Sequence, residues 1–88
     1  MFEAQQADPD KALHLGHAIA KTLEDLGRYE ESEKLHLQVL EARRRLLGED
    51  HPLVGDGVGA LAAVHHYRGE LEEAEELYLE SLEILQRA

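Results

Sequence analysis

The chain has 88 residues and no cysteine, and 19 acidic against 9 basic side chains give it a formal net charge of −10. This length is typical of one small domain with a modest core, and the lack of thiols excludes disulfides and cysteine-bound zinc. The acidic charge disfavours binding to nucleic acid or to an anionic membrane and favours a basic or neutral partner.

Targeting signals are not evident in the sequence. No apolar run approaches the roughly 20 residues that a membrane-spanning helix needs. Residues 1–6 lack the basic and apolar regions of a signal peptide. We therefore expect a cytoplasmic protein.

The first predicted helix follows a short segment, residues 1–8, that we expect to be a disordered or fraying N-terminus. Asp8 is a candidate cap, and Pro9 suits the first helical position because its missing N–H is not needed there. Helical spacing then continues to Gly27, a residue type that ends helices in a left-handed conformation. The apolar residues that carry this spacing are Ala12, Leu15, Ile19, Leu23 and Leu26.

A second helix is predicted from Tyr29 to Leu47, ending at Gly48. Its apolar positions are also spaced for one helix face. Three arginines near its C-terminus suit the negative end of the helix dipole. We expect these arginines to be available to glutamates of another copy of the chain. They are Arg43, Arg44 and Arg45.

Residues 48–52 form the main linker, after which Asp50 or His51 caps a third helix that begins at Pro52. The third helix contains several glycines, each of which costs roughly 1 kcal/mol in a helix interior. Either its first turns are loose or close packing compensates for this cost. The glycines are Gly55, Gly57 and Gly59.

The fourth helix, from Leu71 to Arg87, is the most clearly amphipathic segment. Its start repeats an earlier sequence motif, in which a glycine, Gly27 or Gly69, precedes a glutamate-rich helix start with matching leucines. The two copies of the motif are offset by 42 residues (69 − 27). An internal duplication explains this match. We predict an all-α fold of two helix–turn–helix repeats in a single domain, with repeat 1 at 9–47 and repeat 2 at 52–88.

The second copy of the motif, residues 69–74 with Tyr78 and Ser81, resembles the second helix of a tetratricopeptide repeat. Leu61 and Ala62 resemble the leucine–small pair of that repeat's first helix. The 42-residue spacing and the linker sequence at 47–52 resemble the longer, kinesin-light-chain-like variety. The resemblance implies a short right-handed solenoid of helix pairs.

The resemblance also implies a concave groove that is lined by the first helix of each repeat and holds a peptide or a partner's helix. Small side chains at Gly59 and Ala63 would leave room there for a bulky group. Carried over residue by residue, the partner-binding groove comprises His14, His17, Lys21, Asp56, Gly59, Ala63, His66 and Tyr67.

Catalytic and metal sites receive little support from the sequence. The close histidines His14 and His17, with Asp56, could in principle hold a metal ion, but no zinc-enzyme motif accompanies them. Residues 55–59 alternate glycine with other residues but follow no strand, as a dinucleotide-binding fingerprint requires. We predict no catalytic residue, no metal and no cofactor.

The sequence thus predicts a non-catalytic scaffold for protein–protein interaction that binds a peptide or partner helix. The last helix carries more apolar residues than one neighbouring helix can cover, so we also expect homo-oligomers. The alternatives are a purely architectural oligomerisation module and a fragment of a longer repeat solenoid.

Overall fold

The computed structural model describes residues 9–88, and the side chains of residues 11–88. The predicted N-terminal segment 1–8, with its Asp8 cap, lies outside the described residues. The helices are α1 (Pro9–Asp25), α2 (Tyr29–Leu47), α3 (Pro52–Tyr67) and α4 (Leu71–Arg87). No strand occurs between residues 9 and 88, so the predicted all-α fold is confirmed.

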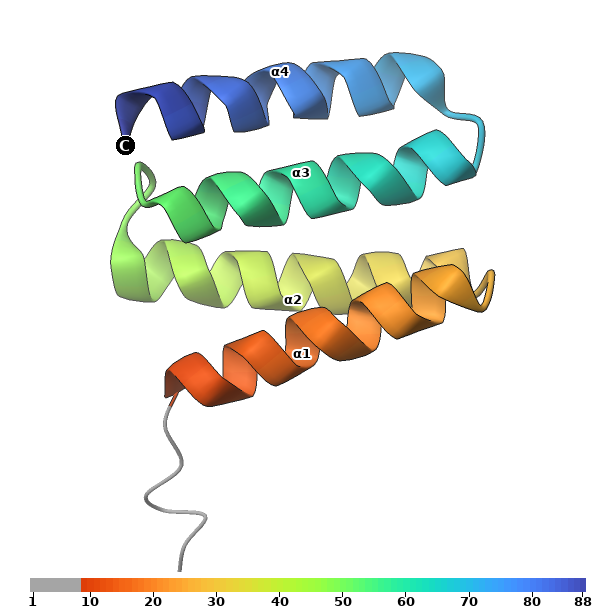
Figure 1. The fold of residues 1–88 in the computed structure, drawn as a ribbon, viewed down its shortest axis with the longest axis horizontal. Helices are drawn as coiled ribbons and strands as arrows, with labels where there is room; N and C mark the ends of the chain where they lie inside the picture. The colour runs from red at the N-terminus through yellow and green to blue at the C-terminus, as the bar shows by residue number, and fades with distance from the viewer. Residues whose placement is uncertain (1–8) are drawn as a thin grey trace, which may run out of the picture.

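The four helices lie side by side in chain order, each antiparallel to the one before (Figure 1). The layer measures 47 × 33 × 13 Å, and its thickness is close to the diameter of a single helix. Within residues 9–88, helices α2 and α3 therefore have a neighbour on each side, whereas α1 and α4 have a neighbour on one side only.

The repeated sequence motif forms the same backbone turn at the two glycine corners, which are the turn between α1 and α2 and the turn between α3 and α4. Gly27 and Gly69 have φ values of 80° and 82°. After each glycine, the next N–H donates to a carbonyl five residues back: Arg28 to Leu23 at 2.8 Å, and Glu70 to His65 at 2.9 Å. This pairing defines a Schellman motif, which satisfies the last carbonyls of a helix and turns the chain back.

The connection between the two repeats has a different cap. His51 precedes α3 in an extended conformation, and its Nδ1 accepts a hydrogen bond from the Leu53 N–H at 3.1 Å. Of the two caps that the sequence allows, the structure therefore selects His51. Pro52 occupies the first helical position, as predicted.

The hydrophobic core is centred on α3, between α2 and α4. Its members are fully or almost fully buried, and Leu77 packs against them. Helix α1 adds only Ala20 to the buried apolar residues of the described chain. The core cluster consists of Leu40, Val54, Val58, Leu61 and Ile84.

Close packing explains the glycines of α3. A Cβ added at Gly55 would lie 2.9 Å from Leu85 Cγ and 3.2 Å from Ile84 Cγ2, and one at Gly57 would lie 3.1 Å from Leu40 Cδ1. The hydroxyl of Ser81 donates to the Gly55 carbonyl at 2.7 Å, which ties α4 to this part of α3. The low helix propensity of these glycines is therefore offset by close approach of the neighbouring helices.

We expect Gly55→Ala to destabilise the protein by about 1 kcal/mol. Overpacking against α4 costs about 1–3 kcal/mol, and the better helix propensity of alanine returns about 1 kcal/mol of that. Urea unfolding followed by circular dichroism measures the change. In a double-mutant cycle, Leu85→Ala should relieve part of the cost. Equal losses with and without Leu85 would contradict this explanation.

Candidate protein-interaction surface

Polar residues of α1 and α3 come together around His17. The His17 ring meets the His36 ring of α2 edge-on, with centroids 5.4 Å apart and planes at 66°. Lys21 of α1 and Asp56 of α3 both act electrostatically on His17. Four residues from three helices thus form one polar cluster, and three of them, His17, Lys21 and Asp56, were predicted to line the groove.

Burial keeps both rings of this cluster neutral at pH 7. It lowers the pKa of His17, the Arg43 cation lowers it further, and the Asp56 carboxylate opposes the shift. Burial also lowers the pKa of His36, to about 4, with additional lowering from His17 and Arg43. The His36 residue is only 2% exposed, and its Nε2 has no hydrogen-bond partner among the described residues.

We expect acid to weaken the fold through His36. Its folded pKa of about 4 lies below the ordinary histidine value of 6.5, so its contribution to stability is complete above pH 6.5 and is lost as the pH falls toward 4. The loss amounts to about 3 kcal/mol at most, from 1.36 kcal/mol per pKa unit. His36→Leu should flatten this part of the stability profile, measured by urea unfolding at several pH values.

Two comparisons isolate the effect. His14→Leu makes the same replacement at an exposed histidine and is the control. Burial raises the pKa of Glu24, which makes folding more favourable as acid is added, so only the difference between variants is diagnostic. A His36→Leu profile parallel to that of the unmodified chain would refute the assignment.

The remaining predicted groove residues of α1 are exposed. His14 lies on the surface, and Lys21 Nζ is 3.9 Å from both Glu24 Oε2 and Asp25 Oδ1. The two carboxylates differ, because the Glu24 side chain is only 3% exposed whereas that of Asp25 is 68% exposed. Lys21 therefore has carboxylates beside it on α1, and a bound partner would compete with them.

The expectation of open space at Gly59 needs correction. A Cβ at Gly59 would lie 3.1 Å from the Ser81 hydroxyl of α4, so this position faces the neighbouring helix. Ala63, the other small residue, is partly buried. The small size of Gly59 thus serves the contact between α3 and α4, and the structure gives no room for a bulky ligand there.

His66 and Tyr67, at the end of α3, contribute to two different places. His66 lines a groove that is otherwise formed by α4. Tyr67 is 59% exposed and stacks on Tyr29 of α2, with ring centroids 6.3 Å apart and planes at 12°. The eight residues predicted for one groove therefore do not form one continuous site.

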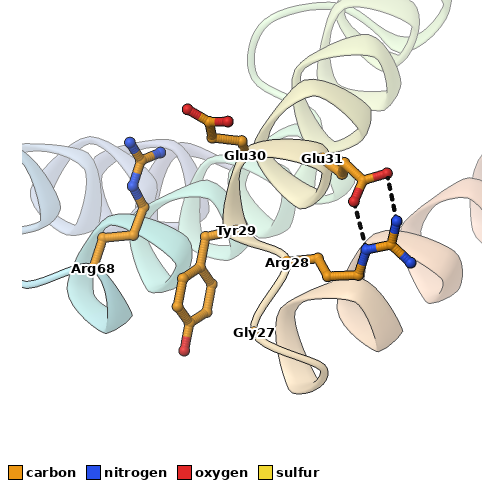
Figure 2. Close-up of a pocket in the computed structure, with 6 residues that line it drawn as sticks. All are labelled: Gly27, Arg28, Tyr29, Glu30, Glu31 and Arg68. Atoms are coloured by element: carbon orange, nitrogen blue, oxygen red, sulfur yellow. Dashed lines mark hydrogen bonds and ion pairs between the residues drawn. The ribbon is translucent and has the colours of Figure 1, made fainter.

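A shallow pocket of about 360 Å³ lies at the first glycine corner. Figure 2 shows Tyr29 projecting beside the Gly27 turn, with Arg68 at the end of α3 nearby. On the other side of the pocket, the Arg28 guanidinium pairs with the Glu31 carboxylate. The corner thus combines an aromatic wall with an ion pair that is already formed.

The three arginines of α2 have partners within the same chain, and their pairing with glutamates of another copy stays a prediction. Arg44 Nη2 lies 3.1 Å from Glu80 Oε2 of α4, and Arg44 Nε lies 3.0 Å from Glu49 Oε1. Arg45 is 3.9 Å from Glu41 within α2. Arg43 is buried, and its Nη1 donates to the Leu53 carbonyl at 3.3 Å.

Sequence reasoning missed two buried polar residues of α2. Leu46 follows the apolar spacing yet is 58% exposed, while His36 and Arg43 are each 2% exposed. One signal was present: His36 and Arg43 lie seven residues apart and on the same helical face as Leu40. Polar residues at core spacing indicate a buried network.

Some site types find no counterpart in the described part of the chain. Between residues 9 and 88, no three histidine, aspartate or glutamate side chains are arranged to hold a metal ion. Within the same range, no helix is both long and apolar enough to cross a membrane.

Repeated helix pairs, glycine corners and polar side chains on the first helices are features of a helical repeat protein. Comparison with known families identifies which one: the family profile described as tetratricopeptide repeat matches residues 10–87. The chain belongs to the tetratricopeptide repeat family. Members of this family are typically non-catalytic modules for protein–protein interaction. No curated protein was found to match the sequence.

Proposed function

We propose that the chain is a non-catalytic scaffold that binds a peptide or a helix of a partner protein on the surface formed by α1 and α3. The observation that carries this proposal is the cluster around His17, where the Asp56 carboxylate of α3 and the Lys21 cation of α1 act on one ring. Charges of both signs beside a half-buried ring can anchor the polar groups of a peptide.

The chain also fits the longer, kinesin-light-chain-like variety of the repeat. Two features support this assignment: the 42-residue offset between Gly27 and Gly69, and the linker at 47–52 in which His51 caps α3. The formal net charge of −10 makes a basic partner the better electrostatic match.

Peptides selected on the purified chain from a random displayed library test the proposal. Isothermal titration should show binding weakened about tenfold by Asp56→Ala or Lys21→Ala, since a hydrogen-bonded charge contributes about 1.5–3 kcal/mol. Glu76→Ala, which removes an exposed carboxylate on α4, is the control and should bind normally. Selected peptides that bind all three variants equally would place the binding surface elsewhere.

Self-association is a second candidate, and the unpartnered helices at the two ends of the layer favour it. Helix α1 exposes Leu15, Ile19 and Leu26, and α4 exposes Leu82 and Leu85 among others. Large apolar side chains in such groups commonly mark protein contact surfaces.

Self-association predicts dimers or larger species in sedimentation velocity at high micromolar concentration, when no other protein is present. Leu82→Glu should shift the distribution to monomer because it places a charge in the centre of the α4 face. Leu37→Glu changes an exposed leucine of α2 and is the matched control. A chain that sediments as a monomer at several hundred micromolar would exclude this candidate.

A further inference from the structure

The outer face of α4 is apolar and has no neighbour within the described chain. Its large side chains are between 43% and 60% exposed, and part of it forms an open groove of about 490 Å³ together with His66. Glu75 is the acidic residue that lines this groove. The apolar residues of the face are Leu71, Tyr78, Leu79 and Leu82.

Helix α2 shows what covers the equivalent face inside the molecule. The 42-residue offset aligns Leu82 of α4 with Leu40 of α2. Leu40 is 4% exposed because it packs in the core with Val54, Val58 and Leu61 of α3, whereas Leu82 is 51% exposed. At Leu82, the face of α4 thus matches a position that, in the first repeat, is covered by the apolar residues of α3.

The internal interface also contains a charge match. Glu33 of α2 accepts a hydrogen bond from Arg68 Nη1 at 2.7 Å, and its second oxygen lies 3.4 Å from His65 Nε2. Both of these bases come from the end of α3. The offset aligns Glu33 with Glu75. Within residues 9–88, Glu75 has no ion pair. Helix α4 therefore carries the equivalent carboxylate but lacks the basic partner that Arg68 supplies to Glu33.

We propose that the outer face of α4 is a docking site for a helix of a partner protein that carries an arginine or a histidine opposite Glu75. The apolar residues of the face cover the partner helix, and Glu75 binds its cation. This docking site does not depend on the proposed peptide site on α1 and α3, because each rests on different charged residues.

A second copy of the chain is a poorer occupant. In a second copy, the helix equivalent to α3 is α1, which exposes the apolar side chains Leu15 and Ile19. However, Leu23 and Leu26 of α1 stand at the positions equivalent to His65 and Arg68. Docking of α1 would cover the Glu75 carboxylate without supplying a cation, and burying an unpaired charge is unfavourable.

An extended chain tests the proposal directly. A copy of residues 47–69 appended after Ala88 keeps the 42-residue register, because Ala88 is equivalent to Leu46. One version retains His65 and Arg68 in the appended copy, and a second carries His65→Leu and Arg68→Leu there, as in α1. Each version is made with Glu75, with Glu75→Gln and with the control Glu76→Gln. Hydrogen exchange of the α4 amides reports docking.

The version with the basic residues should slow exchange in α4 about three- to tenfold more than the leucine version, the range expected for a half-buried ion pair. Glu75→Gln should abolish this difference, and Glu76→Gln should preserve it. Equal or better protection by the leucine version would overturn the proposal in favour of an α1-like occupant, a second copy. No protection by either version would show that the face does not accept a helix.

Discussion

Every other feature of this protein depends on the arrangement of its helices in a single layer. The helices between residues 9 and 88 form a layer 13 Å thick with no second layer behind it, so each helix can bury apolar surface only on its neighbours in the layer. The inner helix α3 is therefore almost fully apolar where it packs, while α1 and α4 keep large side chains exposed. The unpartnered faces at both ends follow from the geometry of a short helical repeat.

Within the layer, small and polar groups hold neighbouring helices together. The Ser32 hydroxyl donates to the Ala20 carbonyl at 2.7 Å and joins α2 to α1, and Ser81 joins α4 to α3 in the same way. Arg43 reaches a backbone carbonyl of α3 from α2. These bonds add directional contacts to a core of modest size. In the same helix, burial lowers the pKa of His36 to about 4, because a charge is costly in that setting.

Most of the fold could be predicted from the sequence, and less of the site. Helix existence followed from apolar spacing, and helix ends followed from Gly27, Gly69 and Pro52. The groove residues were carried over from a family pattern, which gives positions along a helix but not what packs beside them. Gly59 illustrates the limit, because its apparent open space is filled by Ser81 of α4. The spacing of residues along one helix does not show which side chains of other helices pack beside them.

The sequence by itself determined the four helices, their corners and the duplication, because these depend on local backbone preferences and on periodicity. Tertiary structure alone decided which polar residues are buried and which acids have a cation. Glu33 and Glu75 occupy the same position in the repeated sequence motif, yet only Glu33 accepts a hydrogen bond from Arg68. The physical reason is that α2 is covered by a following helix, whereas α4 is the last helix of the layer.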